Sequence, residues 1–205
     1  MNTAAALRVE ALAEGGAFVR LASIDGLAVD LRYAGTGNFA ARVLYDGLDC
    51  AWLRREAAAG LAQSMRWLAA HASARRLVVL DALRPQRVQE AIWRDFAGTE
   101  VAHYFAPPDR GSIHSFGMAA DVTLLDAQGR EVDMGSGFDE MSPRSHPALE
   151  AELLARGELT AAQVAERETL RRAMAAGGWQ GIAIEWWHFN HGDPERVRRE
   201  LPRVL

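Results

Sequence analysis

Asp121 interrupts an otherwise apolar run at residues 119–125, and this carboxylate constrains the fold more than any other feature of the sequence. Two alanines precede it and a valine follows it, so a strand that buries these neighbours also buries the acid. A buried charge is costly unless it is paired, and a metal ion is one possible partner. The chain must therefore bring an opposite charge or a metal to this strand.

His114 lies seven residues before Asp121 in the stretch GSIHSFGMAADVTL, which covers residues 111–124. Residues seven apart on a regular strand point to opposite faces, so a shared site requires a bend between them. Gly117 permits such a bend at little steric cost. The alternative is a surface histidine and a turn aspartate that have no relation to each other.

A second pair of an acid and an imidazole, Glu185 and His188, lies in the apolar stretch GIAIEWWHFNH at 181–191. The edge of an apolar core explains the two tryptophans, but it does not explain Glu185, which directly follows apolar residues. Two histidines and a carboxylate are a common ligand set of catalytic zinc, with the fourth position open to water. His114, Asp121 and His188 make such a set, and Glu185 is a spare carboxylate suited to take a proton from that water.

Arg84, in the stretch LDALRPQR at 80–87, is a further candidate. A salt bridge at the start of a helix would explain an arginine at this position. The functional alternative is a fixed cation that stabilises an oxyanion beside the zinc. Asp81, three residues earlier, could orient it.

The hydrophobic pattern predicts an α+β fold of a single domain. It has a central, mostly antiparallel sheet, with the zinc site at strand ends and helices packed around it. Thr160 and Gln163 form a capping-box pair at the start of the last predicted helix, and Gly177 ends it. The predicted strands are 27–35, 76–82, two within 119–134, and 181–190; the predicted helices are 50–74, 85–97, one starting near 147, and 160–176.

The composition excludes several classes of protein. The 205 residues suffice for one domain with a sizeable core. A net charge of −4 gives no support for binding to nucleic acid or to an anionic membrane surface. Residues 196–200 (RVRRE) are expected to form a solvated helix face.

Cys50 is the only cysteine, so no internal disulfide can form. We find neither a signal peptide nor the roughly 18 apolar residues of a membrane span, and we expect a cytoplasmic protein.

Three motifs occur together in this chain: SIHSFGMAAD (112–121), EWWH (185–188) and DALRP (81–85). They resemble the SxHxxGxAxD pattern, the second metal motif and the Asp-x-x-Arg-Pro stretch of the VanX-type zinc D-alanyl-D-alanine dipeptidases, within the wider zinc D,D-peptidase superfamily. RYAGTGNF, MGSGFDEMSPRSH and LRRAMAAGGW resemble further segments of that family, in the same order. The resemblance covers about residues 25–190 and implies one zinc dipeptidase domain over residues 1–205.

The resemblance implies a reaction and a role for each candidate residue. The reaction is hydrolysis of the D-alanyl-D-alanine dipeptide to two D-alanines, with one zinc ion per chain and a zinc-bound water as nucleophile. His114, Asp121 and His188 are implied to hold the zinc. Glu185 is implied to act as general base, and Arg84 to stabilise the tetrahedral oxyanion.

The same resemblance implies how the substrate binds. Asp139 and Tyr33 are assigned to the free ammonium of the dipeptide, and Ser112 to its carboxylate end. Phe116 and Leu83 depart from the family, since an arginine and a tyrosine are common at these positions, and both changes could alter which dipeptide fits. A small D,D-dipeptide is the implied partner, with no nucleic acid and no membrane; the sequence leaves the oligomeric state open.

Two other functions share many of these residues. One is a D,D-carboxypeptidase that acts on peptidoglycan peptides, which would need an open cleft and normally an export signal. The other is a relative that binds zinc without hydrolysing peptides. Glu185 and Arg84 favour an enzyme, and the missing signal favours a cytoplasmic dipeptidase. The physiological role, whether antibiotic resistance, recycling of wall peptides or use of the dipeptide as a nutrient, is left open.

Overall fold

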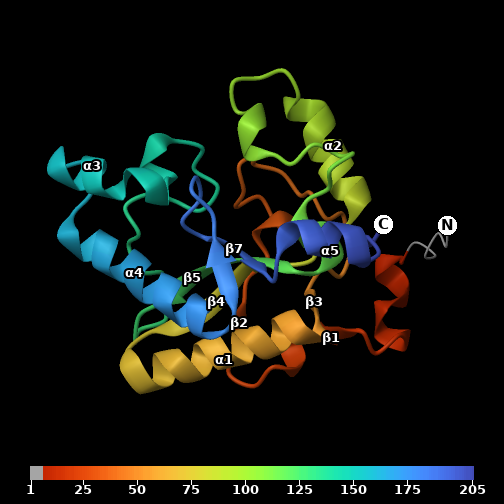
Figure 1. Ribbon diagram of the computed structural model, residues 1–205, viewed down its shortest axis with the longest axis horizontal. Helices are drawn as coiled ribbons and strands as arrows, with labels where there is room; N and C mark the ends of the chain where they lie inside the picture. Colours follow the sequence, from red (N-terminus) through yellow and green to blue (C-terminus); the bar gives the residue numbers. More distant parts are fainter. Residues whose placement is uncertain (1–6) are drawn as a thin grey trace.

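The computed structural model describes residues 7–205 and has a five-stranded central sheet with helices on both sides (Figure 1). The strand order is β2-β4-β5-β7-β6, in which β2 and β4 run parallel and the other neighbours run antiparallel. The predicted α+β class with a mostly antiparallel sheet is therefore confirmed. The strands are β2 (Ala28–Val29), β4 (Arg76–Asp81), β5 (Ala119–Leu125), β6 (Trp179–Gly181) and β7 (His188–His191).

Helices α1 and α4 pack against each other and cover one face of the sheet (Figure 1). Leu61 and Leu68 of α1 and Leu170 of α4 join Val122 and Leu124 of β5 in the main apolar core. The predicted capping box at the start of α4 is present, with both of its hydrogen bonds. No helix within residues 7–205 is long and apolar enough to cross a membrane. The helices are α1 (Arg55–His71), α2 (Gln86–Phe96), α3 (Glu150–Ala155), α4 (Ala161–Ala176) and α5 (Pro194–Glu200).

A second, two-stranded sheet lies beside the first and pairs β1 (Phe18–Arg20) with β3 (Trp52–Arg54). The helix predicted from residue 50 therefore begins later, at Arg55, because the preceding residues pair with β1. Short 3₁₀-helices connect the main elements: Val9–Glu14, Leu21–Ser23, Arg32–Ala34, Ala102–Tyr104, Ile113–Phe116, Pro143–Ser145 and Pro147–Leu149.

Two predicted strands are shorter than expected. Only Ala28–Val29 of 27–35 is a strand, and Arg32–Ala34 is a 3₁₀-helix that buries Tyr33. The second strand expected within 119–134 is reduced to one bridge, between Leu125 and Glu131.

The stretch predicted as one strand at 181–190 is instead a hairpin, in which β6 and β7 flank residues 182–187. Trp186 and Trp187 of this connection are buried in the core, which gives a loop the apolar composition of a strand.

The register of the central strands places polar side chains in one row. Asp81, the last residue of β4, is paired with Asp121 of β5, and Asp121 is paired with His188, the first residue of β7. Along β5, Ala120 and Val122 contribute to the core with α1 and α4. Because side chains alternate between faces along a strand, Asp121 points to the opposite face.

Gly117 makes the bend between His114 and Asp121 that the sequence requires. It ends the 3₁₀-helix Ile113–Phe116 with a φ of 68°, a left-handed conformation that favours glycine. A Cβ atom at this position would lie 2.6 Å from Cε1 of Phe18 and 3.3 Å from the backbone nitrogen of Arg54. Both the backbone conformation and the space therefore exclude a side chain.

We expect Gly117→Ala to destabilise the fold more than Gly129→Ala does. Gly129 has a φ of 78° in an exposed turn, and its nearest atom would be Nη2 of Arg76 at 3.5 Å. The control should lose about 1–2 kcal/mol from the left-handed backbone. Gly117→Ala should lose a further 1–3 kcal/mol or so from overpacking. Equal losses in urea unfolding would contradict the steric argument.

Candidate active site

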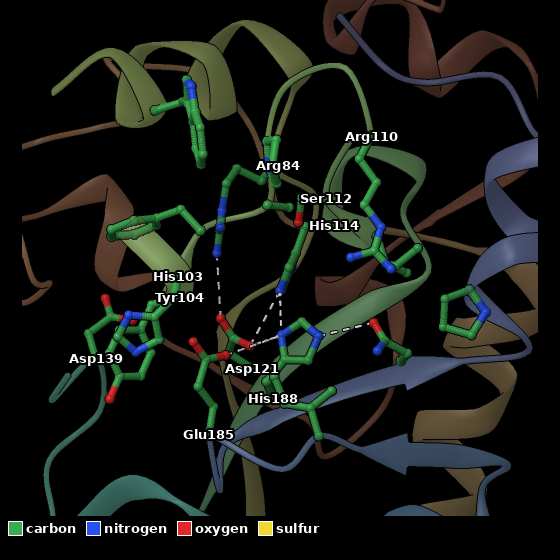
Figure 2. A pocket seen from close by; sticks show the side chains of 18 of the residues that line it. Arg84, His103, Tyr104, Arg110, Ser112, His114, Asp121, Asp139, Glu185 and His188 are labelled. Atoms are coloured by element: carbon green, nitrogen blue, oxygen red, sulfur yellow. Dashed lines mark hydrogen bonds and ion pairs between the residues drawn. The ribbon is translucent and has the colours of Figure 1, made fainter. Parts of the chain in front are cut away.

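A cavity of about 610 Å³ is lined by the side chains drawn in Figure 2. Asp121 faces it from the side of the sheet opposite the core formed with α1 and α4. The strand row of Asp121 and His188 forms its floor, and the loops around residues 102–112 and 139–141 line its walls. All eight candidate residues from the sequence line this cavity: Tyr33, Arg84, Ser112, His114, Asp121, Asp139, Glu185 and His188. Residues far apart in the sequence, from Tyr33 to His188, therefore meet in one place.

His114, Asp121 and His188 each present one ligand atom to the same point. Nε2 of His114 lies 3.2 Å from Nδ1 of His188 and 3.3 Å from Oδ1 of Asp121. Nδ1 of His188 lies 3.0 Å from the same Oδ1. Ligand atoms bound about 2.0–2.1 Å from a tetrahedral zinc ion lie about 3.3 Å apart, so the triangle has the size of a zinc site.

The hydrogen bonds on the far side of each imidazole determine which nitrogen faces the triangle. Nδ1 of His114 lies 2.6 Å from the carbonyl oxygen of Ala82, to which it donates. Nε2 of His188 lies 3.0 Å from Oδ1 of Asn190 and donates to it. The opposite nitrogens therefore present lone pairs toward the carboxylate. Three lone pairs that meet without a proton between them repel one another, and a cation removes this repulsion, so the donor set fits a metal.

The two imidazoles also act on Asp121 itself. Burial alone would raise the pKa of this carboxyl group. In the absence of a metal, protons on the facing nitrogens of His114 and His188 can take the place of the cation, and the charge and hydrogen bonds of the protonated rings hold the pKa of Asp121 well below its usual range. Asp121 therefore stays ionised in the interior. The sequence requires a partner for this buried acid, and the structure places His114 and His188 beside it.

Arg84 is held rigidly at the edge of the triangle. Its Nε and Nη2 atoms donate to Oδ2 of Asp81 over 3.1 and 2.7 Å, and Nη1 donates to Oε1 of Gln89 over 3.2 Å. The guanidinium carbon lies 4.7 Å from the ring centre of Tyr33. Nη2 also lies 3.6 Å from Oδ2 of Asp121, which directs the cation toward the ligand atoms. The structure thus places Asp81 where it orients Arg84.

Glu185 reaches the cavity from the connection between β6 and β7. Its Oε2 lies 3.9 Å from Nδ1 of His188, and it makes no hydrogen bond to another part of residues 7–205. The pKa of Glu185 is raised to about 8, mainly by burial; the charges of Asp121 and Asp139 contribute to the rise, while His188 and Arg84 oppose it. A carboxyl group with this pKa can both accept and release a proton near neutral pH.

Asp139 lies on the other side of the cavity from Arg110 (Figure 2). It has a φ of 59°, and its Oδ2 accepts a hydrogen bond of 3.3 Å from the backbone nitrogen of Phe39. The pKa of Asp139 is raised to about 8, mainly by burial and in part by the charge of Asp121. The carboxylate lacks a cation of its own among its hydrogen-bond partners in residues 7–205.

Sequence reasoning missed several polar residues of the cavity. His103, Tyr104 and Arg110 come from the loop after α2, which has no periodic pattern, and Arg198 comes from a helix expected to face solvent. Asn190, two residues after His188, could have been found as the polar residue of a buried strand.

Phe116 and Leu83, the two departures from the family pattern, are buried elsewhere in the core and do not line the cavity. They have no direct contact through which to select a dipeptide.

Comparison with known proteins finds the same family that the sequence motifs resemble. A family model described as D-ala-D-ala dipeptidase (peptidase M15) matches residues 16–204, a range that includes every candidate residue of the cavity. The chain is 36% identical over 163 residues to the D-alanyl-D-alanine dipeptidase of Escherichia coli (strain K12), covering 80% of this chain and 78% of that protein. It is 30% identical over 183 residues to the D-alanyl-D-alanine dipeptidase of Enterococcus faecalis, covering 81% and 86%.

We expect Asp139→Asn to change how stability depends on pH. With a pKa of about 8 in the folded protein and about 3.9 in the unfolded chain, Asp139 binds more protons when folded. Its contribution to the free energy of unfolding is therefore full at low pH and is lost as pH rises through this window. Relative to Asp139→Asn, the wild type should lose stability from about pH 4 to pH 8, as measured by urea unfolding.

Asp126→Asn is the matched control, because hydrogen bonds from Arg130 lower the pKa of Asp126. The difference between wild type and this control should stay level across the same window and change only as pH falls below it. If the difference in unfolding free energy between wild type and Asp139→Asn is also constant over this window, the pKa of Asp139 is not raised.

Proposed function

Because the chain belongs to the D-Ala-D-Ala dipeptidase family of metallopeptidases, we propose that it hydrolyses free D-alanyl-D-alanine to two D-alanines. The observation that carries this proposal is the convergence of three ligand atoms in one cavity with Glu185 and Arg84 beside them. We further propose that His114, Asp121 and His188 hold one zinc ion per chain. Two imidazoles and one carboxylate, with an open fourth position, are a typical donor set of catalytic zinc.

Glu185 is the proposed general base. The chemistry that zinc supplies when bound is the activation of water and the polarisation of a carbonyl oxygen. Glu185 takes the proton from the attacking water as the new carbon–oxygen bond forms. It then delivers this proton to the amine nitrogen as the carbon–nitrogen bond breaks. A cation at the ligand triangle favours the ionised form of Glu185 that the first transfer requires.

Arg84 is proposed to stabilise the oxyanion that develops on the scissile carbonyl. Asp81, Gln89 and the Tyr33 ring fix its guanidinium before substrate arrives. A donor that needs no reorganisation at the moment of reaction contributes most to the transition state. The buried ion pair with Asp81 therefore acts as a support for the charge that faces the substrate.

The proposed ammonium site at Asp139 limits the length of the substrate. Figure 2 shows His103 and Tyr104 beside Asp139. The hydroxyl group of Tyr104 lies 2.7 Å from Nε2 of His146, which joins the loop after α2 to the segment before α3. These side chains stand where a residue preceding the dipeptide would have to lie. The contact supports a dipeptidase over the D,D-carboxypeptidase alternative, which needs an open cleft.

The remaining parts of the proposal rest on the sequence. A small D,D-dipeptide is the proposed partner, Ser112 is the proposed site of its carboxylate, and nucleic acid and membranes are not proposed partners. A cytoplasmic location is also a proposal, which cell fractionation tests.

Two variants separate the metal ligands from the base. His188→Ala is expected to lose both zinc and activity, whereas Glu185→Gln should keep zinc and lose about 10²- to 10⁴-fold in kcat. Elemental analysis and D-alanine release measure the two effects, and the wild type should hold about one zinc per chain. His191→Ala, on the same strand but outside the cavity, is the control that should keep its zinc. Undiminished zinc in His188→Ala, or normal turnover in Glu185→Gln, would remove that residue from its role.

Blocking the ammonium of the substrate should abolish most activity. N-acetyl-D-Ala-D-Ala and a tripeptide that ends in D-Ala-D-Ala bring a neutral amide and extra bulk to Asp139, which then loses its ion pair with the substrate ammonium. We expect kcat/KM to fall at least about 100-fold relative to the free dipeptide. Asp139→Asn should reduce this ratio, while Asp133→Asn, outside the cavity, should not. Similar values for all three substrates would instead support the carboxypeptidase.

A further inference from the structure

We propose that Arg110 and Arg198 form a second carboxylate-binding subsite in the cavity, and that the enzyme therefore also hydrolyses dipeptides whose C-terminal residue is acidic. The substrate class is D-alanyl-D-glutamate and D-alanyl-D-aspartate. This inference rests on the proposed dipeptidase function and adds a specificity to it.

Arg198 points into the cavity although its helix was expected to face solvent. Its side chain on α5 is 15% exposed, whereas Arg196 and Arg199 of the same helix are 72% and 67% exposed. Its Nε donates to the carbonyl oxygen of Gly111 over 3.3 Å, next to Ser112, and its Nη1 donates to Oε1 of Glu195 over 2.8 Å. The helix thus directs one of its three arginines to the wall near Ser112.

Arg110 reaches the same wall from the loop that leads to Ser112. Figure 2 shows its side chain descending toward the metal-ligand cluster on the side away from Asp139. Its side chain is 60% exposed, so it can rearrange to meet a ligand. Its Nη2 lies 3.4 Å from Oε1 of Glu195, the same oxygen that Arg198 contacts.

The positive charge at this wall is not balanced. Two guanidinium groups share the single carboxylate of Glu195, whose side chain is 68% exposed. Arg203, a third arginine nearby, donates to the backbone carbonyls of residues 108–110.

Some hydrogen-bond donors of Arg110 and Arg198 have no partner in the described part of the chain. Within residues 7–205, Nη2 of Arg198 and the Nε and Nη1 atoms of Arg110 have no hydrogen-bond partner. Each of these nitrogens can donate to a carboxylate oxygen, so the two arginines together can bind one carboxylate.

The direction of the bound dipeptide places its C-terminal residue at this wall. Asp139 takes the ammonium end, and the ligand triangle lies between Asp139 and Arg110 (Figure 2). The residue released by hydrolysis must then lie on the side of Ser112 and the two arginines. Ser112 is the proposed partner of the α-carboxylate. D-Alanine has no second carboxylate for Arg110 and Arg198 to bind, whereas an acidic C-terminal residue has one.

The size of the cavity also leaves room for a longer C-terminal side chain. A volume of about 610 Å³ falls within the range of about 300–1,000 Å³ typical of pockets for drug-sized ligands. A dipeptide of two alanines is much smaller than such a ligand. A carboxylate on the second residue would fill this space and pair with the unbalanced charge.

The test compares kcat/KM of the zinc-loaded wild type for D-Ala-D-Glu with that for its neutral isostere D-Ala-D-Gln. We expect a preference for D-Ala-D-Glu of about 10- to 100-fold, the usual effect of a charge-assisted hydrogen bond. Arg198→Gln and Arg110→Gln should each reduce this ratio, and together they should bring it near one. Arg196→Gln, on the solvent side of α5, should leave the ratio as it is.

Two results would overturn the proposal: a ratio near one in the wild type, or equal losses for both dipeptides and D-Ala-D-Ala in the arginine variants. Equal losses would assign the pair to the α-carboxylate that all three substrates share.

A binding measurement separates this proposal from the proposed function. Calorimetry with zinc-loaded Glu185→Gln gives the ratio of Kd values for D-Ala-D-Glu and D-Ala-D-Gln without hydrolysis, and the same preference is expected. Failure of the wild type to release D-alanine from D-Ala-D-Ala contradicts the proposed function alone. Equal Kd values in this variant contradict the subsite alone.

Discussion

The meeting of three lone pairs in the interior is the constraint on which the rest of the structure depends. Nitrogen atoms of His114 and His188 and an oxygen of Asp121 lie within 3.3 Å of one another. Such an arrangement is unfavourable for the metal-free chain, so each group must be held from behind. The pairing of β5 with β7 fixes two of them, the bend at Gly117 fixes the third, and Ala82 and Asn190 hold the two rings. The apolar contacts of α1 and α4 on the opposite face supply the stability that this arrangement costs.

The acidic residues around this centre differ in whether a cation neutralises them. Asp81 has Arg84 and the hydroxyl group of Tyr45 as partners and serves to orient the arginine. Asp139 and Glu185 have no such cation, and burial raises the pKa of both to about 8. The acids that are fully paired are structural, whereas those left unpaired face the cavity and can exchange a proton or bind an ammonium. Reactivity in this site thus follows from the charges that the fold does not neutralise.

The sequence predicted the centre of the site better than its walls. Asp121 and Glu185 could be found because an acid in an apolar run contradicts its surroundings, and that contradiction is visible in one short stretch. The connection 182–187 was taken for a strand because Trp186 and Trp187 bury their side chains as strand residues do. The 27–35 stretch leaves the sheet after two residues to bury Tyr33. Arg198 could not be distinguished from its neighbours, since only the docking of α5 decides which arginine faces inward.

The position of β7 has a consequence for how the protein is made. It is the last strand of the chain, yet it lies inside the sheet, between β5 and β6. A chain that emerges from the ribosome in order from its N-terminus has β4, β5 and both large helices before it has β7. Until that strand arrives, β6 has no neighbour in the sheet and the candidate metal site has only two of its three proposed ligands. Completion of the sheet and completion of the candidate metal site are therefore a single event, and a nascent chain that has not yet formed β7 lacks one of the three proposed ligands.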